Sequence, residues 1–281
     1  MSSHVKKAKG KRIKKPNWLE LPIDLTKNIL QRLDTVEIVT SARNVCPLWW
    51  NICKDPLMWR TIDMSSFHII RFNRSCLDQI CRCAIDLSSS HLEGIAISAF
   101  GTDDLLEYMA HRASYLRRLQ ISNCNGISNM GLEEFVKKFS LLEELDISLD
   151  KYLSKRSLEA IGRCCPSLKS LKLNIHCYFE VEFADQVFAI AKTMPGLRHL
   201  AFSGICIGNN ELVAILDGCP LLDSLHLQNC VHYRFSQSLD NRLHQQIKDL
   251  QLPYLLYDDD DNGLAYVDTF EDTYANDDWE Y

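Results

Sequence analysis

The sequence predicts an α/β fold in which a short N-terminal helical module precedes a curved solenoid of strand–helix units. The first observation is a six-residue pattern, leucine-x-x-leucine-x-leucine with apolar substitutions, that begins at Leu92, Leu116, Leu142, Leu168, Leu197 and Leu222. Successive copies lie 24, 26, 26, 29 and 25 residues apart, a period typical of units that bury their apolar faces against their neighbours. The second observation is an amphipathic segment between copies, and the third is an apolar N-terminal stretch that lacks this period.

Each copy of the pattern is expected to form a strand, and each segment between copies a helix. Apolar residues three and four positions apart mark the helical segments. These segments cover residues 74–87, 102–114, 129–140, 155–164, 184–194 and 209–219. Three of them end at Cys165-Pro166, Met194-Pro195 and Cys219-Pro220, since proline stops a helix. We therefore expect parallel strands on the concave side of the solenoid and helices on its convex side.

Degenerate strands are expected at both ends of this array. Trp59-x-x-Ile62-x-Met64 precedes the first helix, and Ile247-x-x-Leu250-x-Leu252 follows a helical stretch that contains Leu239 and Leu243. The sequence therefore predicts that the array runs from the edge of the N-terminal module to about residue 256.

The N-terminal module, residues 16–62, is predicted to form three short helices. Pro22 is expected at a first helical position, where its missing N–H is no loss. Asp34, with a glutamate three residues later, resembles a capping box that opens a second helix. Pro47 opens the third helix, and Asp55-Pro56 closes it because the residue before proline avoids the helical region.

A helical unit of this size rarely buries enough surface to be stable alone. It is rich in tryptophan, with Trp18, Trp49, Trp50 and Trp59 in or next to it. One interpretation makes the whole module an apolar cap for the solenoid. The other makes part of its surface a partner site, because aromatic residues are favoured anchors at interfaces.

The module resembles an F-box in three successive segments: LELPIDLTKNILQRL, NVCPLWW and DPLMW. It departs from many family members at Asp34-Thr35, where they have a proline-containing turn. The resemblance implies docking on a Skp-type adaptor and, through it, on cullin and RING subunits of a ubiquitin ligase. Position by position, it implies adaptor contacts from Leu21, Pro22, Leu25, Ile29, Leu30, Val45, Cys46 and Trp49.

The repeats CPSLKSLKL, MPGLRHLAF and CPLLDSLHL resemble the cysteine-containing leucine-rich repeats found behind F-boxes. Together the two halves are similar to the plant F-box/leucine-rich-repeat family. The expected organisation is a basic arm at 1–15, an F-box at 16–62, a solenoid at 63–256 and an acidic tail at 257–281.

The two ends of the chain have opposite charge and are expected to be disordered. Residues 1–15 hold seven Lys or Arg and no acid, whereas residues 258–281 hold ten Asp or Glu and no base. The arm is interpreted as a nuclear localisation signal or as a solvated tail. A nucleic-acid-binding role is less favoured, because the arm contains no aromatic residue for base stacking.

The expected location is the nucleus, the cytoplasm or both. No secretory signal follows the basic arm, and no apolar run approaches the roughly 18 residues of a membrane span. Twelve cysteines fit such a compartment if their thiols are reduced. Because the chain contains no C-x-x-C pair, buried structural cysteines are favoured over zinc or disulfides.

The outward positions of the strands are the candidates for target binding. They are polar and mixed in sign, which suits a protein partner better than nucleic acid, since the latter calls for clustered Lys and Arg. For any single position a solvated residue is the simpler interpretation. As a strip, the candidates are Arg118, Gln120, Glu144, Asp146, Lys172, Asn174, His199 and His226.

No enzyme motif, metal site or cofactor is predicted. The chain has no G-x-S-x-G, no phosphate-binding glycine loop and no H-E-x-x-H, and none of its nine histidines lies at a spacing from a carboxylate or cysteine that defines a site. Together with the absence of these motifs, the F-box resemblance implies a non-catalytic substrate receptor of an SCF ubiquitin ligase that marks a target protein for proteasomal degradation. The alternative is an interaction scaffold that uses the same two surfaces without ubiquitylation.

Overall fold

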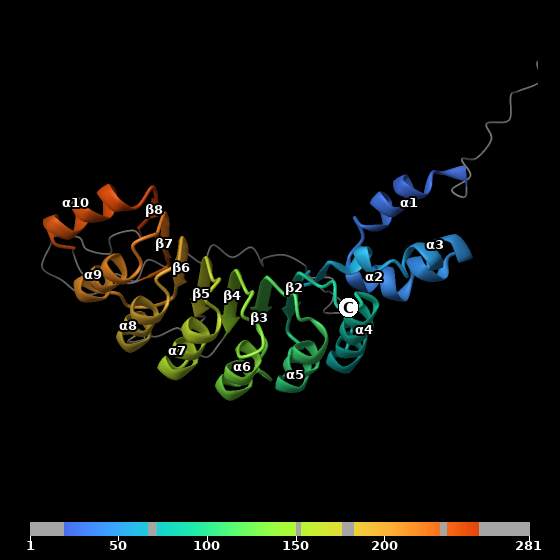
Figure 1. Ribbon diagram of the computed structural model, residues 1–281, viewed down its shortest axis with the longest axis horizontal. Coiled ribbons are helices and arrows are strands. Elements are labelled where there is room, and N and C mark those ends of the chain that lie inside the picture. The colour runs from blue at the N-terminus through green and yellow to red at the C-terminus, as the bar shows by residue number, and fades with distance from the viewer. Residues whose placement is uncertain (1–19, 67–71, 150–152, 176–182, 231–234, 253–281) are drawn as a thin grey trace, which may run out of the picture.

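The computed structural model describes residues 20–66, 72–149, 153–175, 183–230 and 235–252. Within these residues, eight strands form one parallel sheet in sequence order, β1 to β8. The sheet lines the inner side of a curved solenoid and the helices of the repeats cover its outer side, with the F-box helices at one end (Figure 1). The predicted fold class is confirmed.

The strands follow the repeat pattern closely. Their bounds are Thr61–Met64 (β1), Gly94–Ser98 (β2), Arg118–Ser122 (β3), Glu144–Leu149 (β4), Ser170–Ile175 (β5), His199–Ser203 (β6), Ser224–Gln228 (β7) and Asp249–Gln251 (β8). Both degenerate end strands are therefore present.

The helices of the repeats also lie where the apolar spacing predicts them. Their bounds are Arg74–Leu87 (α4), Asp103–Arg112 (α5), Asn129–Val136 (α6), Lys155–Cys164 (α7), Ala184–Thr193 (α8), Asn209–Gly218 (α9) and Gln237–Gln246 (α10). Several begin at a residue whose side chain accepts a hydrogen bond from a backbone N–H of the first turn, which satisfies one of the unpaired donors there. These residues are Asn73, Thr102, Ser128, Ser154 and Ser236.

The F-box forms α1 (Ile23–Leu30), α2 (Thr35–Thr40) and α3 (Pro47–Ile52), with 3-10 turns η2 (Ala42–Asn44) and η3 (Pro56–Trp59). The Asp34 carboxylate accepts a hydrogen bond from the Glu37 N–H at 2.7 Å, so the predicted cap of α2 is present. Pro47 is the first residue of α3, as predicted. Pro22 instead lies one residue before α1, at its N-cap.

The F-box and the solenoid share one apolar core, which extends from Leu30 to Ile247. Strand β1 crosses the boundary expected between residues 62 and 63, and its Ile62 and Met64 are fully buried. Beside it, the indole N–H of buried Trp59 donates to the Cys53 carbonyl at the end of α3, 2.8 Å away. The first strand therefore attaches the F-box to the repeats by continuous packing.

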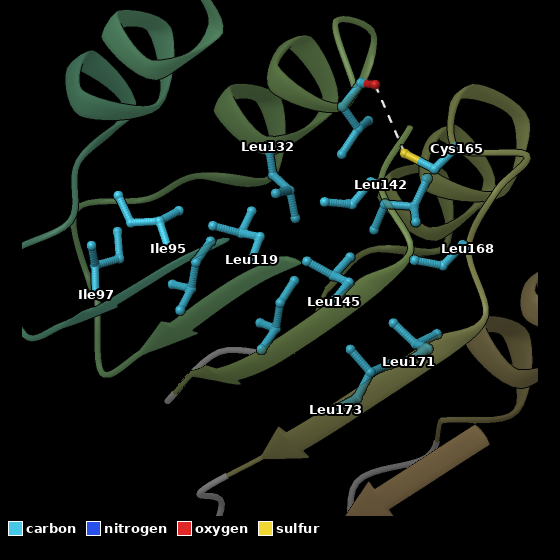
Figure 2. Packing of buried hydrophobic residues seen from close by; sticks show 14 of the residues in the cluster. Ile95, Ile97, Leu119, Leu132, Leu142, Leu145, Cys165, Leu168, Leu171 and Leu173 are labelled. Carbon is cyan, nitrogen blue, oxygen red and sulfur yellow. Dashed lines mark hydrogen bonds between the residues drawn. The ribbon is translucent and has the colours of Figure 1, made fainter. Parts of the chain in front are cut away.

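Within the repeats, equivalent leucines stack from strand to strand, as Leu119, Leu145 and Leu171 do in Figure 2. The thiol of buried Cys165 donates to the Val136 carbonyl of the preceding repeat at 3.9 Å, drawn as the dashed line in Figure 2. The Cys219 thiol makes the equivalent contact with Met194 at 3.5 Å. Because a small thiol fills the turn and reaches this carbonyl, cysteine is suited to the end of a repeat helix.

The residues just before each strand form a row of ion pairs along one edge of the sheet, which we name the edge ladder. Its members alternate in charge except at Lys169 and Arg198, and they are Arg60, Glu93, Arg117, Glu143, Lys169, Arg198, Asp223 and Lys248. Five of the six neighbouring couples of opposite charge form ion pairs, the exception being Glu93 and Arg117. Their N–O distances are 2.6 Å (Arg60–Glu93), 2.5 and 3.0 Å (Glu143 with Arg117 and Lys169), and 3.4 and 2.7 Å (Asp223 with Arg198 and Lys248). The hydrogen bond from Lys169, followed by that from Arg117, lowers the pKa of Glu143.

Candidate protein-interaction surfaces

The first candidate surface is a set of exposed apolar side chains on the F-box. Ile23 and Leu25 of α1 are 60% and 50% exposed, and Val45, between η2 and α3, is 63% exposed. Trp50 of α3 and Leu57 of η3 are also exposed. Single exposed apolar residues are common, but five within one small module indicate a surface that another protein covers.

The eight residues expected from the F-box resemblance to contact an adaptor differ in how much of their surface is exposed. Pro22, Leu25 and Val45 are exposed, and half-buried positions are occupied by Leu21, Ile29, Cys46 and Trp49. Leu30, in contrast, has no exposed surface, so the expectation that it contacts an adaptor is corrected. Leu30 belongs to the apolar core of the protein.

Local polar contacts hold this surface in place. Lys27 of α1 pairs with Asp55 at 2.5 Å, which connects the first helix to η3. The hydrogen bond from Lys27 and a second from the Leu57 N–H lower the pKa of Asp55. The cationic groups of Arg43 and Lys54 lie 5.2 and 5.1 Å from the Trp50 ring centroid, within the range of cation–π attraction.

The second candidate surface is the outward row of the concave sheet. The strand register places equivalent positions directly side by side: Asp63, Ala96, Gln120, Asp146, Lys172, Ala201 and His226. A second row of outward positions, two residues earlier on each strand, contains Thr61, Gly94, Arg118, Glu144, Ser170 and His199. The alternation of strand side chains therefore gathers the predicted strip on one face.

Five of the eight predicted target-binding residues line one hollow of about 310 Å³ in the N-terminal half of this face. They are Arg118, Gln120, Glu144, Asp146 and Lys172. At this hollow the outward positions of β2 are occupied by Gly94 and Ala96, which are small and leave space between β1 and β3. Thr61 and Asp63 complete its wall, and sequence reasoning did not propose them.

The other three predicted residues lie away from this hollow. Asn174 donates to Ser148 Oγ at 2.9 Å, and His226 Nε2 lies 2.7 Å from Asp249 Oδ2. His199, in the neighbouring row, is exposed. Two of the three are therefore already engaged within the protein.

Sequence reasoning did not propose the His226–Asp249 pair. Ser224 Oγ completes the group, at 3.0 Å from Asp249 Oδ2 and 3.1 Å from His226 Nε2. The bond to His226, followed by the bond to Ser224, lowers the pKa of Asp249. Because both contacts use the same imidazole nitrogen, Asp249 does not orient the ring toward the serine as a hydrolytic triad requires. The signal that predicts this pair is the repeat register, which aligns Ser224 with Asp249.

The buried thiols are in an apolar setting that favours their protonated form. Burial raises the pKa of Cys165 to about 12 and the pKa of Cys219 to about 11. Across the described residues, no three His, Cys, Asp or Glu side chains come together as a group that could hold a metal ion. None of the helices described is both long and apolar enough to cross a membrane.

The F-box domain family matches residues 18–61. F-box protein SKIP19 of Arabidopsis thaliana is 42% identical over 237 residues, which cover 84% of this chain and 77% of that protein. The chain belongs to the F-box/leucine-rich-repeat family. Two further Arabidopsis relatives of this family are similar over most of the chain. F-box/LRR-repeat protein 22 is 38% identical over 95% of this chain and 90% of its own length. F-box/LRR-repeat protein 23 is 42% identical over 84% of this chain, which spans only 53% of that protein.

The family resemblance proposed from the sequence is therefore confirmed. The F-box helices lie at one end of the solenoid and the sheet lines its concave side (Figure 1). The F-box carries the exposed apolar side chains, and the sheet carries the polar hollow. The two surfaces are chemically different, since one is dominated by exposed Leu, Ile and Val and the other by charged and amide groups.

Proposed function

We propose that this chain is the substrate-recognition subunit of an SCF-type ubiquitin ligase. The F-box binds a Skp-type adaptor, which connects to cullin and RING subunits, and the concave strip binds a target protein. The observation that supports this most directly is the exposed apolar surface within the matched F-box. Burial of such a surface is the main favourable term in protein association.

The chain itself contributes proximity instead of catalysis. The apolar core that the F-box and the repeats share holds the two binding surfaces in a fixed relation. A target bound to the repeats is therefore held within reach of the conjugating enzyme that the RING subunit recruits. Holding two reactants together in this way raises their effective concentration. The target's lysines are then modified by groups that lie outside this chain.

Co-purification with a Skp-type adaptor tests the proposal. Replacing Leu21 and Pro22 with alanine should abolish adaptor capture while the thermal unfolding of the repeats stays unchanged. The control is Leu221→Ala, because Leu221 is an exposed leucine that lies near the opposite end of the solenoid. Adaptor capture by the double variant at the wild-type level would contradict the proposal.

Adaptor binding alone does not establish degradation, so the fate of the target needs its own measurement. We expect the half-life of a captured protein to shorten in cells that contain this chain and to recover under proteasome inhibition. An unchanged half-life, with no ubiquitin on any captured partner, would favour a non-degradative scaffold.

We infer further that the protein is located in both nucleus and cytoplasm. The support is the basic arm KKAKGKRIKK, which has the composition of a nuclear localisation signal. Replacing its Lys and Arg with glutamine should lower the nuclear fraction of a fluorescent fusion. An unchanged fraction would leave the arm as a solvated tail.

A further inference from the structure

Charged residues on the sheet follow two contrasting arrangements. In the edge ladder, one position before each strand, opposite charges form ion pairs at 2.5–3.4 Å. One and three positions further along the same strands, charged residues face the concave hollow. These are Arg118, Glu144, Asp146 and Lys172, which we name the concave tetrad.

The concave tetrad has complementary charges in register, yet they remain apart. Arg118 lies opposite Glu144, and Asp146 lies opposite Lys172. Within the part of the chain that the structure describes, no member of the tetrad forms an ion pair within 4.0 Å or a hydrogen bond through its side chain. A chain that pairs its charges along the edge thus leaves four unpaired charges in the adjacent hollow.

The position of Arg118 explains part of this separation. Its guanidinium lies over Gly94 of β2, so close that a methyl group at position 94 would lie 3.2 Å from Nε. The guanidinium therefore occupies space that glycine leaves open, and Glu144 has no cation within ion-pair distance. Glu144 and Asp146 are two residues apart on β4, so both carboxylates lie on the same face.

Asp146 shows the physical cost of this arrangement. The residue is half-buried, and burial raises its pKa, while the charge of Lys172 acts in the opposite direction without overcoming it. A carboxylate that loses water and gains no hydrogen bond is stabilised by any cation that enters the hollow. The chemistry that fits Glu144 and Asp146 is therefore a Lys or Arg side chain.

We infer that the concave tetrad selects target proteins by charge, taking a segment in which one Lys or Arg lies between two acidic residues. The basic residue pairs with Glu144 and Asp146, and the flanking acids pair with Arg118 and Lys172. Adjacent strands are about 4.8 Å apart, so the two cations of the tetrad lie on strands about 10 Å apart, within reach of side chains on one extended segment. This inference rests on the proposed function, because it specifies what the target-binding surface recognises.

The test uses two synthetic peptides immobilised at high density, Ser-Asp-Ser-Lys-Ser-Asp-Ser and its charge inverse Ser-Lys-Ser-Asp-Ser-Lys-Ser. The full chain is passed over both peptides at low ionic strength. We expect the wild-type chain to be retained about tenfold more strongly by the first peptide, as four ion pairs of the modest strength typical of protein surfaces allow. Retention that is equal on the two peptides, including no retention on either, overturns the inference.

Two variants sharpen the experiment. Reversing the tetrad with R118E, E144K, D146K and K172E should reverse the preference between the peptides. The control, R242E with D217R, exchanges the charges of an ion pair on α9 and α10, away from the hollow, and should leave the preference unchanged. Equal reversal by the control would also overturn the inference. Failure of the proposed function is distinguishable, because it appears as absence of adaptor capture by the wild-type chain whatever the peptide result.

Discussion

The indole N–H of Trp59 donates a hydrogen bond to the backbone carbonyl of Cys53, 2.8 Å away, where the F-box meets the first strand of the sheet. Trp59 is almost completely buried. Replacing it with phenylalanine retains most of the apolar volume but removes the donor, leaving the carbonyl without this bond. We expect the free energy of unfolding to fall by about 1–3 kcal/mol.

Urea unfolding monitored by circular dichroism measures this loss. The control is Trp50→Phe, because Trp50 is exposed on the F-box and its substitution should change stability by about 0.5 kcal/mol or less. If W59F and W50F unfold at the same urea concentration, the Trp59–Cys53 contact does not stabilise the junction.

The neighbours Cys164 and Cys165 should differ in reactivity. Cys165 is buried with a pKa raised to about 12, whereas Cys164 is half-buried at the end of α7. Alkylation requires the thiolate and access to reagent, so iodoacetamide at pH 8 should modify Cys164 first. Tandem mass spectrometry of the native protein locates the label. Modification of Cys165 at an equal rate would show that the repeat opens readily.

The sequence predicts the fold well because the repeat requires the same packing at every turn. Leu119, Leu145 and Leu171 are each one residue of a pattern, and their stacking in register follows from the period alone. The burial of Cys165 and Cys219 follows in the same way, from their place at the end of a repeat helix. Local signals such as Asp34 and Pro47 then set where individual helices begin.

The site was less predictable because availability depends on which neighbours satisfy each group. Asn174 and His226 occupy outward positions on the same face as the tetrad, but Ser148 and Asp249 engage them. Leu25 and Leu30 are both leucines of α1, yet only the packed structure shows which of them faces the core. Sequence spacing identifies the face of a strand or helix, and contacts between repeats decide which residues on it remain free.

Leu25 and Leu30, on the same F-box helix, should separate adaptor binding from stability. Leu25 is half exposed, so Leu25→Asp should abolish adaptor capture with little change in unfolding. Leu30 is fully buried, so Leu30→Ala should lower the free energy of unfolding by about 2–5 kcal/mol. Adaptor pull-down and urea unfolding of both variants check this prediction. Retained adaptor capture by L25D would remove Leu25 from the interface.

Glu143 and Asp146, three residues apart in β4 and its preceding turn, should respond to pH in opposite directions. The pKa of Glu143 is lowered by Lys169 and Arg117, so its charged form stabilises the folded state above its ordinary pKa, and this contribution is lost as pH falls. Glu143→Gln should therefore destabilise the protein at pH 7. The difference from wild type should shrink as pH falls through the lowered pKa.

Burial raises the pKa of Asp146, so ionisation favours the unfolded state and its contribution to stability is lost as pH rises through the raised value. Asp146→Asn cannot ionise and should therefore be more stable than wild type at pH 7, with the two converging as pH falls toward the ordinary pKa near 3.8. Urea unfolding between pH 7 and pH 3 measures both variants. Destabilisation by D146N at pH 7 would mean that the carboxylate has a partner in the folded protein, and the concave tetrad would then be a structural pairing instead of an open recognition surface.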